Sequence, residues 1–238
     1  MNASPDLPPM VIDRAAERLR SQLVSGALLP GQRLSEVALS ASLGISRNSL
    51  REVFRLLTKE GLLRHLPNRG VFVAIPSMAS IIDIYRVRRM VECQALAQAI
   101  AQHPARRAMR EAVAEQRRLA QAGRWQDVGS ANMRFHQGVV ALADSERLDA
   151  LFAHLLVELR LAFGMLRDAE FLHAPYVEMN AAILERFEAG DMARAAELMR
   201  EYLTHSERAV LSAHARHVGD AGATPAAAPK GRRKLSEK

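Results

Sequence analysis

The chain carries a long stretch of purely helical periodicity, from Ser77 to about His217, and this limits the folds open to it more than any other feature. Apolar residues recur there every three or four positions, and the pattern does not alternate as a β-strand would. Prolines, glycines and short polar turns divide the stretch into predicted helices at 78–102, 105–122, 125–143, 146–168, 172–189 and 191–215. Helices of these lengths, joined by short turns, are typical of an antiparallel helical bundle.

The first 76 residues follow a different pattern. We expect a helix from Val11 to Gly26, a short helix capped by Ser35 and stopped by Gly44, a third helix from the N-cap Ser46 to Gly61, and a β-hairpin with strands 62–66 and 71–75. Two helices joined by a tight turn have the form of a helix-turn-helix, and the hairpin has the form of a wing. The predicted fold class is therefore mainly α: an N-terminal winged helix-turn-helix (three helices plus a β-hairpin), then an all-α antiparallel bundle of about six helices.

These patterns predict a domain over residues 1–76, a second over 77–217, and a disordered basic tail over 218–238. The tail is rich in Ala, Gly, Pro and charge and has no periodic apolar face. Its basic run at 231–234 either adds affinity for phosphates or is simply a solvated end.

Composition limits the class of protein. The chain has 238 residues, of which 49% are apolar and 25% charged, as in ordinary globular domains. Its single cysteine, Cys93, cannot form an internal disulfide, which favours a reducing compartment. The sequence has no 18-residue apolar run and no signal-peptide pattern at its start, so we expect a cytoplasmic protein.

The formal net charge of +7 is unevenly distributed. Residues 1–76 carry ten basic and six acidic side chains, residues 77–216 carry eighteen of each, and residues 217–238 carry five and two. A basic excess confined to a small N-terminal segment indicates a polyanionic partner for that segment. An excess of this size also occurs on solvated surfaces, so charge alone leaves both interpretations open.

The third helix has side chains suited to DNA. Arg47 and Arg51 are four residues apart and share one face near the N-terminus of the helix. Arginine can pair bidentately with guanine in the major groove, while Asn48 and Ser49 can donate to bases or phosphates. Arg69, in the hairpin turn, would reach an adjacent groove or phosphate. The alternative is an amphipathic helix with a solvated arginine face.

The segment 23–76 strongly resembles the winged helix-turn-helix of GntR-superfamily transcription regulators. The resemblance rests on the elements SGALLPGQRLSE, LGISRNSLRE and EGLLRHLPNRGVFV. It implies that DNA is contacted by Arg33, Ser46, Arg47, Asn48, Ser49, Arg51, Asn68, Arg69 and Gly70. The chain departs from the family at Val37, where many members have arginine. This departure implies the loss of one DNA contact and a different operator sequence.

Several polar residues interrupt the apolar stripes of the predicted bundle. Arg88 lies one turn before Glu92 and can pair with it. Asn132 and His136 share one face of a later helix, while Asn180 and Tyr202 interrupt the stripes of the last two helices. Because a buried polar group without a partner costs about 1–3 kcal/mol, these groups either satisfy one another or line a cavity for a polar ligand.

The region from about 78 to 215 resembles the FCD effector domain of the FadR subfamily. The resemblance rests on DIYRVRRMVE (83–92), NMRFHQGV (132–139), MNAAILERFEAGD (179–191) and MREYL (199–203). Many FCD domains bind a divalent metal through one aspartate and three histidines, and the matching positions here are Asn132, His136, Asn180 and Tyr202. Only His136 is a metal-ligand type that zinc or nickel prefers, so we expect no tightly bound metal and no cofactor. An unconventional site made by His173, His205 and Glu178 is the alternative.

The function expected from these features is that of a bacterial transcription regulator. It would bind a palindromic operator as a homodimer, act as a repressor, and respond to a small organic acid, sugar acid or acyl derivative. We expect the effector to be bound by Arg88, Glu92, Asn132, His136, Asn180 and Tyr202, with Arg88 facing a carboxylate or phosphate. One alternative is a DNA-binding dimer whose bundle is a scaffold without an effector. Another is a helical-bundle enzyme, but the sequence has only one Glu-x-x-His pair, Glu170 with His173, and no catalytic motif.

Overall fold

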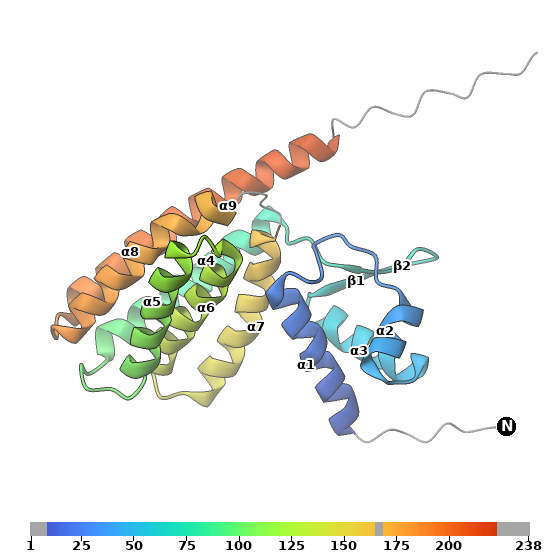
Figure 1. Cartoon of the computed structure of the whole chain (residues 1–238), viewed down its shortest axis with the longest axis horizontal. Helices are drawn as coiled ribbons and strands as arrows, with labels where there is room; N and C mark the ends of the chain where they lie inside the picture. The colour runs from blue at the N-terminus through green and yellow to red at the C-terminus, as the bar shows by residue number, and fades with distance from the viewer. Residues whose placement is uncertain (1–8, 165–168, 223–238) are drawn as a thin grey trace, which may run out of the picture.

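The computed structural model describes residues 9–164 and 169–222 and shows a small N-terminal head beside an elongated helical body (Figure 1). We call residues 9–76 the head and the described residues from 77 onward the body. The head consists of α1 (Pro9–Ser25), α2 (Glu36–Leu43), α3 (Arg47–Lys59), β1 (Leu63–Leu66) and β2 (Gly70–Val73). The strands pair antiparallel, with Leu63 opposite Val73 and Leu66 opposite Gly70. The predicted winged helix-turn-helix is confirmed.

Local capping fixes the turn between α2 and α3. The Ser35 hydroxyl accepts a hydrogen bond from the backbone amide of Ala38 at the start of α2. The Ser46 hydroxyl accepts one from the backbone amide of Ser49 at the start of α3. Gly44 ends α2 in the left-handed region at φ 69°, a conformation that glycine adopts without the steric cost of a side chain. These caps start and stop two short helices within a few residues, as a helix-turn-helix requires.

Within the described residues the body consists of helices alone. They are α4 (Met78–Gln98), α5 (Arg106–Gln121), α6 (Trp125–Ala141), α7 (Glu146–Phe163), α8 (Ala169–Glu188) and α9 (Met192–Gly222). The helix pairs with the most extensive contacts are α5 with α6, α4 with α9, and α8 with α9. A large apolar core, with Phe135, Phe152 and Phe187 fully buried, and a smaller apolar cluster around Val128 hold the bundle together. In the described part of the chain, no helix is both long enough and apolar enough to cross a bilayer.

Several predicted helix boundaries differ from the structure. The helix predicted over 146–168 ends at Phe163, and the one predicted over 125–143 ends at Ala141. The first bundle helix ends at Gln98 rather than 102, because Ala99 is extended and the chain turns before Pro104. The helix predicted from 172 begins already at Ala169 and contains Pro175. The last helix continues to Gly222, so the disordered tail predicted from 218 does not begin there. Residues 165–168, predicted as helix, and residues 223–238 of the predicted tail lie outside the described residues.

The head and the body share apolar packing through α7. Val157 and Leu161 of α7 belong to the same apolar cluster as Leu19, Leu23 and the other core residues of the head. These contacts bury apolar surface of α1 against α7. Burial of this surface holds the head against the body, in addition to the covalent linker at Pro76.

A buried arginine reinforces the junction. Arg160 of α7 is 6% exposed, and its Nε donates to the carbonyl of Val24, in the last turn of α1, over 2.7 Å. Its Nη2 donates to Gln126 Oε1 over 3.3 Å. A helix C-terminus has unpaired carbonyls and partial negative charge, both of which suit a cation. Burial lowers the pKa of Arg160, and burial together with this cation lowers the pKa of neighbouring His173 to about 4.

Replacing Arg160 tests the junction. The substitution Arg160→Met leaves the Val24 carbonyl and the Gln126 amide without their donor, and we expect the free energy of unfolding to fall by about 1.5–3 kcal/mol. Urea denaturation followed by circular dichroism measures this change. The control is Arg147→Met, at an exposed arginine of α7. Equal stability of the two variants would contradict the role given to Arg160.

Candidate functional site

The first candidate site is the exposed N-terminal part of α3. The side chains of Arg47 and Asn48 are exposed, and Arg51 follows one turn later on the same face. Ser49 is placed differently: it is 8% exposed, and its hydroxyl lies 2.9 Å from the hydroxyl of Ser46. Both serines therefore belong to the cap of α3, while the side chains of Arg47, Asn48 and Arg51 are exposed.

Arg51 is held by a residue that the sequence analysis did not select. Its Nε lies 3.1 Å from Oε2 of Glu36, in the first turn of α2, and both side chains remain partly exposed. A partly exposed ion pair contributes little to stability, but it restricts where the guanidinium points. Glu36 could have been suspected only from the turn geometry, because fifteen residues separate it from Arg51.

The wing places further cations beside α3. Asn68 and Gly70 adopt positive φ angles of 60° and 100°, which make the tight turn, and Arg69 between them is exposed. Arg33 pairs with Phe72 through an isolated β-bridge, so it lies alongside the hairpin. Figure 1 shows α2 and the tip of the hairpin on the side of the head away from the body. Of the predicted residues of the head, Arg33, Ser46, Arg47, Asn48, Arg51, Asn68 and Arg69 are exposed, Gly70 is partly exposed and Ser49 is buried.

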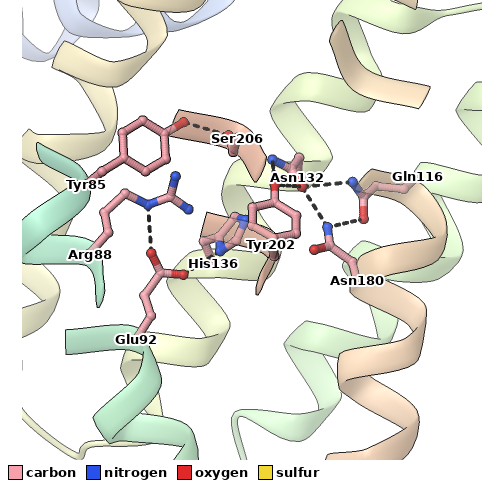
Figure 2. Close-up of polar contacts among 9 residues, drawn as sticks. All are labelled: Tyr85, Arg88, Glu92, Gln116, Asn132, His136, Asn180, Tyr202 and Ser206. Carbon is pink, nitrogen blue, oxygen red and sulfur yellow. Dashed lines mark hydrogen bonds and ion pairs between the residues drawn. The ribbon is translucent and has the colours of Figure 1, made fainter. Parts of the chain in front are cut away.

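The second candidate site is a buried polar cluster in the centre of the body. Figure 2 shows its members: Tyr85, Arg88, Glu92, Gln116, Asn132, His136, Asn180, Tyr202 and Ser206. They come from α4, α5, α6, α8 and α9. All six residues predicted to bind an effector are brought together here. Sequence reasoning missed the other three, although Gln116 interrupts an apolar stripe of α5 just as Asn180 does in α8.

One half of the cluster is ionic. Arg88 Nε donates to Glu92 Oε1 over 2.7 Å, and His136 Nδ1 lies 2.5 Å from Glu92 Oε2; all three residues are at most 1% exposed. Burial opposes ionisation of Glu92, but the charge of Arg88 and the contact with His136 outweigh it and lower the pKa of Glu92. Burial also lowers the pKa of His136. In its neutral form His136 donates from Nδ1 to Glu92 and leaves Nε2 as an acceptor.

The other half of the cluster is a network of neutral groups. Asn180 Nδ2 donates to Asn132 Oδ1 over 2.6 Å and to Gln116 Oε1 over 2.9 Å. The Tyr202 hydroxyl lies 2.9 Å from Asn132 Nδ2 and 3.1 Å from Asn132 Oδ1. Burial raises the pKa of Tyr202, so the phenol keeps its proton. Four helices are tied together here by amide and hydroxyl groups.

Three polar atoms in the cluster have no hydrogen-bond partner within the described residues. They are Arg88 Nη2, His136 Nε2 and Asn180 Oδ1, one donor and two acceptors. Buried polar atoms of this kind are rare in folded proteins because each costs desolvation energy. In Figure 2 Arg88 and Asn180 lie on opposite sides of His136 and Tyr202. The cluster is thus equipped to hydrogen-bond a small polar molecule.

The cluster does not offer a set of strong metal ligands. Asn132, His136, Asn180 and Tyr202 do converge, but three of the four are a neutral amide or a protonated phenol. The alternative residues do not converge: His173 contacts Phe163, His205 lies 3.2 Å from the Tyr176 hydroxyl, and exposed Glu178 pairs with Arg117. Among the described residues no three His, Cys, Asp or Glu side chains gather as metal ligands. The residues present do not fit a divalent metal.

A separate cavity of about 440 Å³ lies between the head and the body. It is lined by α1 on one side and by α6 and α7 on the other, and its polar lining includes Arg20, Arg134 and His154. Arg20 is already paired with Glu60 over 2.5 Å. This cavity contains none of the residues of the buried polar cluster.

Comparison with known proteins identifies both parts of the chain. Residues 11–73 match the family model described as bacterial regulatory proteins, gntR family, and residues 83–205 match the FCD domain. The structure resembles that of a GntR transcriptional regulator from Rhodococcus sp. RHA1, with a TM-score of 0.80 and 34% identity, over 84% of this chain and 97% of that one.

Curated relatives are named as transcriptional regulators. BphR of Paraburkholderia xenovorans, an uncharacterized HTH-type regulator, is 25% identical over 212 residues, covering 82% of this chain and 83% of BphR. The chain spans only about a third of the length of several others. Among these partial matches is the HTH-type transcriptional repressor RspR of Escherichia coli, 36% identical over 75 residues, or 32% of this chain and 33% of RspR.

The family and these relatives are regulators rather than enzymes. The winged helix-turn-helix head and the helical body match the two models in order and extent. The chain belongs to the GntR family of bacterial regulatory proteins and carries an FCD domain.

Proposed function

We propose that this protein is a repressor that binds a palindromic operator as a homodimer and responds to a small, anionic metabolite. The observation that carries the DNA-binding part is the arginine face of α3 beside the wing. Arg47 and Arg51 project from a capped helix N-terminus, where the helix dipole also attracts phosphate. A dimer would present two such faces to two half-sites, which explains why we expect a palindrome.

The effector part rests on the buried polar cluster. Arg88 Nη2 can donate to a carboxylate, while His136 Nε2 and Asn180 Oδ1 can accept from hydroxyl or amide groups of the same molecule. Because Glu92 already balances the charge of Arg88, the ligand would share this guanidinium rather than meet an isolated cation. A small organic acid, sugar acid or acyl derivative with further polar groups has the matching chemistry.

A scaffold without an effector is the second candidate. It is favoured by the network of Gln116, Asn132, Asn180 and Tyr202, whose members mostly satisfy one another. In that case the cluster would only fix how the helices of the body pack.

The arginine face is tested by substitution. We expect Arg47→Ala and Arg51→Ala each to weaken specific binding by about 1–3 kcal/mol, because a guanidinium that reads a base edge is lost. Fluorescence anisotropy with a duplex selected from a random pool measures this loss. Arg107→Ala, at an exposed arginine of α5, serves as control. Unchanged specific affinity in both α3 variants would refute the assignment of α3 as the recognition helix.

The effector site is tested by ligand-dependent stability. A panel of organic and sugar acids is screened by thermal unfolding, and we expect at least one to stabilise the protein, by about 2.7 kcal/mol at a concentration one hundred times its Kd. The double variant Arg88→Met with Glu92→Gln removes the ion pair without leaving one charge buried alone. We expect it to lose that stabilisation. Stabilisation that persists in the double variant would place the effector elsewhere, and no stabilisation by any acid would favour the scaffold.

Metal content is tested directly. Because amide and phenol groups hold divalent transition metals weakly, we expect protein purified without chelators to contain far less than stoichiometric zinc, nickel or manganese. Plasma mass spectrometry gives the ratio of metal to chain. A near-stoichiometric ratio would show that the metal is held by ligands other than Asn132, Asn180 and Tyr202.

A further inference from the structure

Arg160 is a buried cation that forms no ion pair within the described residues. Its guanidinium hydrogen-bonds to the carbonyls of Val24 and Gln126 and to the side-chain amide of Gln126. These neutral groups satisfy N–H donors but carry no charge that would compensate the guanidinium. Because desolvation of a charge is costly, buried arginines are ordinarily paired with an anion. The surroundings of Arg160 therefore favour binding of a negative charge.

The acidic group that acts on Arg160 compensates it only in part. Asp127, in the first turn of α6, raises the pKa of Arg160, but burial lowers that pKa by more. The carboxylate of Asp127 is 47% exposed and already paired with Arg124 over 2.7 Å. Water screens an exposed carboxylate strongly, so most of the charge of Arg160 remains without compensation.

His173 of α8 lies beside this guanidinium. A Cβ at Gly129 would come within 2.6 Å of His173 Nε2 and 2.7 Å of Arg160 Nη1, so the two nitrogens lie close together over the glycine. His173 is 4% exposed, and its ring forms no hydrogen bond with any residue that the structure describes. Burial and the charge of Arg160 lower the pKa of His173 to about 4. The ring is therefore neutral near pH 7 and has one N–H to donate.

The side chains of these two residues line a small cavity between the head and the body. Its volume is about 60 Å³. A single water needs about 10–15 Å³ by the same measure, so the cavity has room for a small ion. Its walls are largely apolar and include Leu23, Leu161 and Leu172, while the first turns of α6 and α8 line it through Gln126 and Ala169. Helix N-termini carry partial positive charge, which also favours an anion.

We propose that this cavity binds one small monovalent anion between Arg160 and His173, of the size of chloride or of the carboxylate of a short organic acid. The anion accepts hydrogen bonds from the guanidinium and from the N–H of the neutral imidazole, and its charge compensates that of Arg160. A dianion brings one charge more than the guanidinium offsets. Since Arg160 also holds the end of α1, a bound anion stabilises the packing of the head on the body. The site shares no residue with the buried polar cluster.

The experiment follows urea denaturation of the full-length protein while chloride replaces sulfate at constant ionic strength and pH. Sulfate stabilises folded proteins by exclusion from their surface, so this exchange lowers stability unless chloride binds. At a chloride concentration ten times its Kd, we expect binding to lower the equilibrium constant for unfolding about elevenfold, along a saturating curve. A second titration uses formate. A saturating response to chloride, to formate or to both supports the site and identifies the anion.

Two variants test whether the effect arises at this cavity. His173→Phe removes the imidazole N–H but keeps an aromatic ring against Phe163, and it should lose the saturating response. Arg160→Met removes the charge and should lose the response as well. Because Arg160→Met also weakens the junction, His173→Phe decides the outcome if the methionine variant does not fold.

Two further proteins serve as controls and should keep the full response. They are Arg147→Met, at an exposed arginine of α7, and the double variant Arg88→Met with Glu92→Gln, in the buried polar cluster. Hydrogen exchange of the backbone amides of residues 23–28, at the end of α1, should slow when chloride is added. The proposal is overturned if no anion gives a saturating response, if His173→Phe responds as the unmodified protein does, if the double variant loses the response, or if exchange at 23–28 is unchanged.

Discussion

The body of this protein is organised around one buried ion pair, between Arg88 and Glu92. Two charges removed from water are strongly unfavourable unless each is paired and hydrogen-bonded. Glu92 meets this condition by contacting Arg88 on its own helix and His136 on α6. The ring of His136 in turn packs edge-on against Tyr202 of α9, 4.8 Å between ring centroids. The electrostatic requirement of one carboxylate therefore fixes how three helices are placed.

The same helices that hold the cluster also reach the head. Gly129 lies one turn before Asn132 on α6, and a side chain there would come within 2.8 Å of both Arg160 and His173. Arg160 donates a hydrogen bond to the carbonyl of Val24 at the end of α1. His173 lies on α8, which also carries Asn180. In addition, His214 of α9 lies 2.9 Å from the carbonyl of Pro76, in the linker between head and body. The body therefore contacts the head both at the end of α1 and at the linker.

In the head, helix caps and a tight turn determine where the exposed cations lie. Its caps, at Ser35 and Ser46, fix where two helices start, and Gly70 allows the wing to turn tightly beside Arg33. On this frame the exposed cations are placed by geometry rather than by burial, so they can exchange water for phosphate or base edges at little structural cost. The segment 77–216 has equal numbers of basic and acidic side chains, whereas the segment 1–76 has more basic than acidic ones.

Local sequence patterns were enough to predict the type and order of the elements, because helical periodicity, caps and glycine stops are properties of a few neighbouring residues. They also identified Arg47 and Arg51 on α3 and the polar interruptions at Arg88, Asn132 and Asn180. The partners of Asn132 and Arg51 became known only from the folded chain: Gln116 and Tyr202 at Asn132, and Glu36 at Arg51. The contacts of Tyr85 with Ser206 and of Arg160 with Val24 had no signal in the sequence. Periodicity specifies which face of a helix turns inward, but not which helix lies opposite, at what height or at what rotation. Those choices depend on packing between segments as far apart as residues 24 and 160, which a one-dimensional pattern does not record.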